Sequence, residues 1–140
     1  MKKIVALLML TVMLFSCTQE KNEKQPDATS VYYFIRHAEK DRSNPENKNP
    51  DLTGAGNKRA EKWAIVLKDI SFDAVYSTNY NRTLQTAAPV AKQNNIEITG
   101  YDPRGIDINV FKADTKGKTV LVVGHSNTCL LYTSPSPRDS

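Results

Sequence analysis

The chain is poor in cysteine and histidine. The 140 residues include two cysteines and two histidines. No cluster of basic side chains is interleaved with aromatic ones, so nucleic-acid binding has little support. The apolar stretch from Ile4 to Phe15 is too short to span a bilayer comfortably, since about 20 residues are needed. No internal repeat is visible, and the length allows at most one domain.

The start of the chain has the organisation of a secretory signal. Lys2 and Lys3 form a positive region ahead of the apolar stretch. The following residues, Leu14-Phe-Ser-Cys17, resemble a bacterial lipoprotein cleavage site. This resemblance implies that Cys17 becomes the lipidated N-terminus, anchored to a membrane in the cell envelope and facing the periplasm or the cell surface. A plain signal peptide with an incidental cysteine, or an uncleaved anchor, is the alternative.

The residues after this cysteine are polar and show no periodicity. The stretch from Thr18 to Ser30 indicates a flexible tether between lipid and domain. Loss of Lys2 and Lys3 with the signal leaves 17 basic against 15 acidic residues, so the net charge falls from +4 to +2. If Cys17 is acylated, no disulfide within the chain is possible, although the compartment is oxidising.

The last twelve residues depart from the pattern that precedes them. From Cys129 the sequence is Cys-Leu-Leu-Tyr-Thr-Ser-Pro-Ser-Pro-Arg-Asp-Ser. This run resembles the translation of a transposase adapter used in short-read sequencing libraries. It therefore implies a non-native tail and a domain that is incomplete at its C-terminus; a genuine Ser/Pro-rich tail is the alternative. The expected organisation is a signal at 1–16, a tether at 17–30, a domain at 31–128 and a non-native tail at 129–140.

Apolar runs rich in β-branched residues alternate with helical patterns through the middle of the chain. Strands are predicted at 31–35, 73–77, 96–98 and 119–123, and helices at 54–68, 81–93 and 107–114. Thr53 is expected to cap the first of these helices, and Pro89 to kink the second. Strands that alternate with helices predict an α/β fold with a mostly parallel sheet.

The two histidines occupy equivalent positions in this pattern. His37 follows the run Val31-Tyr-Tyr-Phe-Ile35 after one arginine, and His125 follows Thr119-Val-Leu-Val-Val123 after one glycine. In open α/β sheets, ligands bind beyond the carboxyl ends of the strands. We therefore expect both imidazoles on the ligand-binding face. The polar loop from Glu39 to Asp51 is long enough to be a lid or a specificity loop.

Three short motifs lie at these junctions. Arg36-His37-Ala38-Glu39 follows the first strand, Arg82-Thr83-Leu84-Gln85-Thr86-Ala87 opens a helix, and Gly124-His125-Ser126 follows the last strand. Arginine donates paired hydrogen bonds and stays charged, which suits the peripheral oxygens of a phosphoryl group. A helix N-terminus also favours an anion. In this order the motifs resemble the histidine phosphatase superfamily, also called phosphoglycerate mutase-like, over residues 31–128.

The resemblance implies a three-layer domain and a phosphatase that works through a phosphohistidine. His37 is the expected nucleophile, and it needs a neutral imidazole with its other N–H held by a carbonyl or carboxylate. Arg36, Arg82 and His125 are expected to complete the phosphate pocket. Glu39 is a further candidate for substrate binding, with a plain surface charge as the alternative. The resemblance implies no metal and no cofactor, and the expected substrate is a phosphorylated small molecule or phosphoprotein.

The chain departs from the family pattern in two respects. Many members have glycine where this chain has Ala38, which is a mild change. The family usually places an acidic proton donor between the second arginine and the second histidine, and such an acid contributes about 10²–10⁴-fold. The candidates are Glu97, Asp102 and Asp107, with Asp102 preferred. Phosphohistidine phosphatases of the superfamily lack this acid, so its absence would not abolish activity.

Two other functions stay open at this point. One is a lipoprotein that binds a phosphate ligand without turnover. The other is a metal hydrolase that uses His37, Glu39 and His125, although their spacing is poor for a preformed metal site. Mutase activity is not expected, because the short chain shows no apparatus for reloading the phosphoryl group.

Overall fold

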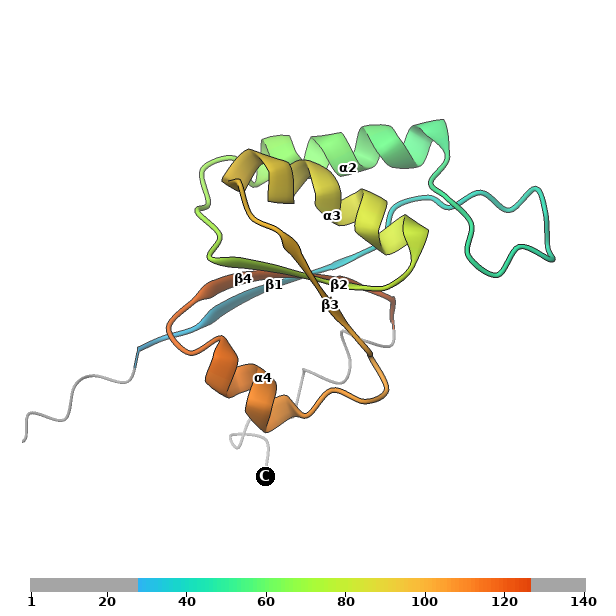
Figure 1. Ribbon diagram of the computed structural model, residues 1–140. Helices are drawn as coiled ribbons and strands as arrows, with labels where there is room; N and C mark the ends of the chain where they lie inside the picture. The colour runs from blue at the N-terminus through green and yellow to red at the C-terminus, as the bar shows by residue number, and fades with distance from the viewer. Residues whose placement is uncertain (1–27, 127–140) are drawn as a thin grey trace, which may run out of the picture.

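The computed structural model describes residues 28–126 as a sheet with helices on both faces (Figure 1). The strands are β1 (Val31–Arg36), β2 (Ala74–Thr78), β3 (Ile98–Tyr101) and β4 (Thr119–Gly124), and the helices are α2 (Gly54–Val66), α3 (Asn81–Asn94) and α4 (Ile108–Asp114). All four of these strands run parallel, as the α/β prediction requires. The predicted signal, the lipidation site at Cys17 and the tail at 129–140 lie outside the described residues.

The order of the strands across the sheet is β1-β4-β2-β3. The last described strand of the sequence therefore lies between the first two. In the register of β1 with β4, Arg36 is level with Gly124. His37 and His125 follow these two strands. They consequently lie side by side at the carboxyl ends of neighbouring strands.

Two layers of helix cover this sheet, with α2 and α3 on one face and α4 on the other (Figure 1). The strand β4 is apolar throughout because it is buried on both faces. Leu121 and Val123 belong to the core beneath α2 and α3, whereas Val120 and Val122 pack with Phe111 of α4. None of the four β4 side chains is more than 2% exposed. The three-layer arrangement expected from the resemblance is confirmed.

The predicted elements are present, and one strand is displaced along the chain. The strand predicted at 96–98 begins at Ile98, which is paired with Val75 of β2. Asn95 ends α3 in the left-handed conformation, at a φ of 55°. The N–H of Ile96 then donates to the carbonyl oxygen of Ala91 at 3.0 Å. This helix cap occupies the residues at which the strand was predicted to start.

The first helix after β1 begins as the sequence predicts. The Thr53 hydroxyl accepts a hydrogen bond from the N–H of Gly56 at 3.0 Å and caps α2. Ala60 on its inner face and Leu67 at its C-cap are buried. Pro89 lies inside α3, which is continuous through it, and the predicted kink stays a prediction. None of the helices between residues 28 and 126 is long and apolar enough to cross a membrane.

The start of α2 is pressed against the backbone that follows His37. The carbonyl oxygen of Glu39 accepts hydrogen bonds from the Thr53 N–H at 2.8 Å and from the Thr53 hydroxyl at 3.2 Å. A Cβ added at Gly56 would overlap this same oxygen, so the approach requires glycine. These contacts hold the segment after β1 in one position.

The folded region includes Ser30, which the sequence assigned to the tether. Its hydroxyl donates to the carbonyl oxygen of Thr115 at 2.9 Å and accepts from the N–H of Gly117 at 2.8 Å. Both partners lie in the turn between α4 and β4. A polar serine gives no sequence signal for this pair of hydrogen bonds, and the domain boundary after residue 30 stays a prediction.

Candidate active site

The two histidines lie together at the carboxyl ends of β1 and β4. The N–H of His37 donates to the carbonyl oxygen of Gly124 at 3.0 Å, which continues the pairing of the two strands. The ring centroids of His37 and His125 are 5.4 Å apart, with the ring planes at 68°. The edge-to-face arrangement brings both imidazoles to one place beyond the sheet, as expected for a ligand site of an α/β fold.

The tautomer of His37 follows from its hydrogen bond. Nδ1 lies 2.7 Å from the carbonyl oxygen of Ala38. A carbonyl oxygen can only accept, so Nδ1 carries the proton and Nε2 of the neutral ring keeps its lone pair. The N–H of Ala38 donates to the hydroxyl of Thr86 in α3 at 3.0 Å. The residue whose carbonyl orients the imidazole, Ala38, is thus bonded to α3 through its N–H.

His125 is oriented by a chain of hydroxyl groups. Its Nε2 lies 3.2 Å from Oγ1 of Thr78. The Thr78 hydroxyl donates to Oγ1 of Thr83 at 3.0 Å, and the Thr83 hydroxyl donates to the carbonyl oxygens of Thr78 and Tyr80 at 2.7 and 2.8 Å. Since the Thr78 proton is already used, Nε2 of His125 is the donor to Thr78.

Arg82 reaches this site from the first turn of α3. Its guanidinium carbon lies 4.4 Å from the centroid of the Tyr80 ring, and that ring is in turn 5.2 Å from the ring of His125. Nε and Nη1 of Arg82 are buried, with no hydrogen-bond partner among the described residues. Buried donors without partners are unfavourable by about 1–3 kcal/mol, and more for charged groups. An anion bound here would remove this penalty.

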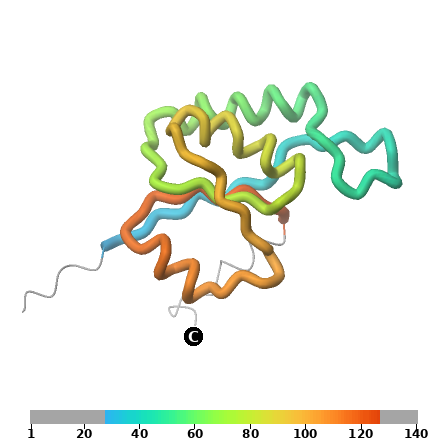
Figure 2. The backbone as a smooth tube through the Cα atoms, viewed as in Figure 1, coloured from blue at the N-terminus to red at the C-terminus, as the bar shows by residue number. Residues whose placement is uncertain are grey.

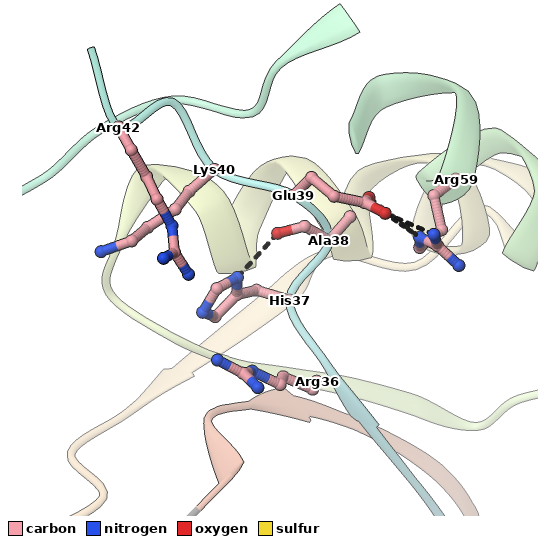
Figure 3. Close-up of a pocket in the computed structure, with 7 residues that line it drawn as sticks. All are labelled: Arg36, His37, Ala38, Glu39, Lys40, Arg42 and Arg59. Carbon is pink, nitrogen blue, oxygen red and sulfur yellow. Dashed lines mark hydrogen bonds and ion pairs between the residues drawn. The ribbon is translucent and has the colours of Figure 1, made fainter. Parts of the chain in front are cut away.

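Two open cavities meet at His37. One, of about 410 Å³, extends from His37 toward Glu39 and Arg59 (Figure 3). The other, of about 520 Å³, is lined by Arg36, His37, Arg82 and His125 together with residues of the loop after β1. All four residues predicted from the motifs therefore line one cavity.

Burial and nearby cations lower the pKa of both histidines. Desolvation is the main cause for His37, followed by a hydrogen bond to Ala38 that acts in the opposite direction and by the charges of Arg82, Arg36 and Lys40. Desolvation and the same cations lower the pKa of His125 to about 4. Both rings are therefore neutral at neutral pH, which a nucleophilic imidazole requires.

The sequence model of the histidine phosphatase superfamily (branch 1) matches residues 32–104, which include the first two motifs and the loop between β1 and α2. The chain belongs to this superfamily. The comparison with curated proteins gave no significant match.

Solved structures of the superfamily share the fold. A SixA protein from Agrobacterium tumefaciens, assigned as a phosphohistidine phosphatase, is 25% identical; the likeness covers 69% of this chain and 70% of that one with a TM-score of 0.59. A phosphoserine phosphatase from Entamoeba histolytica is 19% identical over 74% and 79% of the two chains, with a TM-score of 0.57. A phosphoglycerate mutase from Bacillus anthracis is 16% identical over 73% and 77%, with a TM-score of 0.59.

Glu39 is directed away from the histidine pair. Its carboxylate forms a two-pronged ion pair with Arg59 of α2, with Nε of Arg59 at 2.7 and 2.9 Å from the two carboxylate oxygens (Figure 3). This hydrogen bond holds the pKa of Glu39 below its usual value. The residue lines the smaller cavity and not the one that contains Arg82 and His125.

None of the three predicted proton donors lines a cavity with His37. Asp102 borders a separate cavity of about 570 Å³, and its Oδ1 accepts a hydrogen bond from the N–H of Arg104 at 2.9 Å. Asp107 caps α4, and Glu97 is exposed ahead of β3. β3 lies at the opposite edge of the sheet from β1, so two strands separate the segment that follows it from β1 and His37.

The described residues contain no group of three or more histidine, cysteine, aspartate or glutamate side chains that could hold a metal ion. The metal hydrolase hypothesis used His37, Glu39 and His125. Of these, Glu39 is bonded to Arg59 instead. The part of the chain from 28 to 126 therefore offers no ligand set for that reaction.

Several residues that shape the site carried no clear signal in the sequence. Thr78 and Thr83 orient His125 through hydroxyl groups, and Tyr80 packs between His125 and Arg82. Thr83 and Thr86 lie in the motif that opens α3, but the sequence gives no sign of their hydrogen bonds to Thr78 and Ala38, which depend on the packing of α3. The basic residues Lys40 and Arg42, which follow the first motif closely, are a sequence signal that could have been used.

Proposed function

We propose that the chain is a phosphatase that transfers a phosphoryl group from its substrate to Nε2 of His37 and then to water. The observation that carries this proposal is the hydrogen bond from Nδ1 of His37 to the carbonyl oxygen of Ala38. It leaves the Nε2 lone pair available in a cavity lined by Arg36, Arg82 and His125. This is the arrangement that nucleophilic catalysis by imidazole needs.

In the first step, the Nε2 lone pair forms a bond to phosphorus while the bond from phosphorus to the leaving oxygen breaks. The carboxyls that line the two cavities with His37 are Glu39 and Asp41. Hydrogen bonds to Arg59 and Ser43 lower their pKa values, so both are ionised at neutral pH and the leaving oxygen takes a proton from solvent. In the second step, a water oxygen bonds to phosphorus and one water proton is released to solvent. The P–N bond breaks, its electron pair returns to Nε2, and phosphate leaves. The proton on Nδ1 stays hydrogen-bonded to Ala38 throughout, so His37 returns to its starting form.

The charged groups around the cavity act on the phosphoryl oxygens. Arg36 and Arg82 provide two guanidinium groups from different elements, which suits an anion whose charge is spread over three oxygens. A phosphate dianion opposes the cations that lower the pKa of His125. Its binding would raise that pKa and thereby favour a protonated His125 ring that donates to the phosphoryl group.

The proposed substrates are phosphate monoesters or phosphorylated partners with good leaving groups. A good leaving group needs little help from a positioned acid, and the carboxyls of Glu39 and Asp41 that line the cavities have lowered pKa values, which does not suit a proton donor. The 25% identity to the Agrobacterium protein supports a substrate of this kind. Lipid anchoring at Cys17 is part of the proposal and is supported by the sequence alone.

The covalent intermediate can be trapped directly. The full-length chain is mixed with phenyl phosphate labelled in the phosphoryl group, quenched within one turnover, and digested. We expect label on the peptide that contains His37, stable in alkali and lost in acid, as for a P–N bond. Turnover without label, or an acid-stable label, would rule out the phosphohistidine route. Tight phosphate binding without turnover would instead support the non-catalytic alternative.

Thr78 acts on the reaction as a positioning residue through His125. Thr78→Val keeps the shape of this fully buried side chain but removes the acceptor for Nε2 of His125. We expect kcat to fall by about 10- to 100-fold, the usual effect of losing an orienting partner, with a smaller change in KM. Thr78→Ser keeps the hydroxyl and should restore most of the rate. A merely structural role would give equal losses in both variants and an unchanged His125 pKa by NMR titration.

A further inference from the structure

Two basic side chains, Lys40 and Arg42, border the site in addition to the arginines of the motifs. Both line the cavity of about 410 Å³ and the cavity of about 520 Å³. Figure 3 shows the Arg42 guanidinium extended toward the side of the His37 ring. The charge of Lys40 contributes to the lowered pKa of both histidines. Neither cation forms an ion pair with a carboxylate in the described part of the chain.

The loop that carries these cations is held against the site at both ends. The backbone of Lys40 forms an antiparallel bridge with Leu52. Near its end, the loop is joined to the first turn of α3 through Asn81, whose N–H donates to Asn49 at 2.9 Å and whose side-chain amide donates to Asp51 at 2.8 Å. The loop projects beyond the carboxyl end of β1 (Figure 2). The far end of the loop that carries Lys40 and Arg42 is therefore attached to the same helix turn as Arg82.

The charges around the larger cavity do not balance. Its lining contains four cations, Arg36, Lys40, Arg42 and Arg82, and one carboxylate, Asp41. This leaves three net positive charges with both histidines neutral. A phosphate dianion compensates two of them, and in a partly desolvated site the remaining charge attracts a further anion. The volume of about 520 Å³ lies within the range of about 300–1,000 Å³ that small-molecule sites occupy.

We propose that the substrate is a small organic phosphate with a second anionic group, which Lys40 and Arg42 bind. This inference rests on the proposed phosphatase function. Arg36 and Arg82 hold the phosphoryl group that is transferred to His37, and the second anion lies on the loop side of the cavity. A carboxylate or a second phosphate has the required charge. Arg42 can bind either with two parallel hydrogen bonds, and Lys40 adds a compact charge.

The test compares three aryl phosphates that differ in the group meta to the ester. These are meta-carboxyphenyl phosphate, its uncharged counterpart meta-carbamoylphenyl phosphate, and meta-phenylene bisphosphate. The proteins are the full-length chain, the double variant Lys40→Gln/Arg42→Gln and the control Lys58→Gln/Lys62→Gln. The control removes the same two charges from exposed positions of α2 outside both cavities. The measured quantity is the ratio of kcat/KM for each ester with a second anionic group to kcat/KM for the carbamoyl ester.

We expect the unsubstituted protein and the control to prefer a substrate with the second anion by about 10- to 100-fold, the range for hydrogen bonds to a charged group. In the Lys40/Arg42 variant the ratio should fall close to one, and Arg42→Gln alone should lower it in part. A larger ratio for the carboxylate or for the bisphosphate identifies which anion the subsite prefers. Thermal unfolding of all variants checks that the fold is intact.

Other results would overturn the inference. It fails if the unsubstituted protein does not distinguish the charged esters from the carbamoyl ester, or if the ratio survives in the Lys40/Arg42 variant. It also fails if a phosphohistidine-bearing protein is turned over faster than every ester, independently of Lys40 and Arg42. Absence of turnover for all three esters, together with no trapped phosphoenzyme, would instead contradict the proposed phosphatase function itself.

Discussion

Replacing His37 by alanine is expected to lower kcat/KM by about 10⁴-fold or more, the order of loss when an enzyme nucleophile is removed. The reason is specific to this ring. Its Nδ1 proton is committed to the Ala38 carbonyl oxygen, so Nε2 is the atom with an available lone pair. The variant should also accumulate no labelled phosphoenzyme. Steady-state kinetics and rapid-quench labelling measure the two effects.

His125→Ala is the matched control, because it removes the only other imidazole of the chain from the same cavity. We expect its kcat to fall by about 10²–10³-fold, as for loss of one donor to a developing charge, while labelled phosphoenzyme still forms. His37 is only partly buried, so the midpoint of thermal unfolding should change little in His37→Ala. An acid-labile label that persists in His37→Ala would show that another residue accepts the phosphoryl group.

Replacing Arg82 by glutamine is expected to lower kcat/KM by about 10²–10³-fold and to change its pH dependence. The reaction needs neutral His37, so activity falls as the pH drops through the pKa of His37. In the unsubstituted protein this pKa lies below the ordinary value of 6.5. The Arg82 charge contributes to lowering it, so Arg82→Gln should raise it. The acid limb of kcat/KM should therefore move to higher pH in the variant.

Two further variants separate the charge of Arg82 from its shape. Arg82→Lys keeps the positive charge and should keep the acid limb of the unsubstituted protein, but it loses the paired hydrogen bonds and most of the rate. Arg104→Gln removes an exposed arginine that pairs with Asp102 in another cavity, and should change neither property. With one substrate throughout, its own phosphate ionisation contributes equally to every profile. An unchanged rate in Arg82→Gln would exclude this guanidinium from the reaction.

Arg82→Gln should not destabilise the fold. Nε and Nη1 of Arg82 are buried without hydrogen-bond partners in the described region. Removing an uncompensated buried charge is neutral or favourable for folding, against the loss of the contact with Tyr80. We therefore expect a similar or slightly higher midpoint of thermal unfolding. A variant that is less active and no less stable is typical of residues that serve binding.

The elements with strong sequence signals were predicted closely. β1 and β4 were predicted from their apolar runs, whose side chains pack on the faces of the sheet, and Thr53 caps α2 with the hydroxyl that the sequence offers. β3 has a weaker signal, since it is short and at the edge of the sheet. Its predicted start was displaced because the left-handed cap at Asn95 is a local conformation that hydrophobic periodicity does not report.

The candidate site was predicted in part for a related reason. Arg36, His37, Arg82 and His125 each lie at the end of a strand or the start of a helix, where a motif can indicate position. Asp102 lies in a loop, and its direction depends on which edge of the sheet β3 occupies. The cations in the loop after β1 were passed over because the hydrogen bonds that attach this loop to α3 join residues about 30 positions apart in the sequence.

The amino-acid sequence by itself determined which segments are strands and helices, which residue types follow them, and the family to which the chain belongs. Periodicity, capping and motif order are local properties and need no knowledge of the rest of the fold. Only the tertiary structure decided that β4 lies between β1 and β2. This order brings His37 beside His125, although 88 positions separate them in the printed numbering. Strand order arises from how all the helices and strands pack, so no single segment of the chain specifies it.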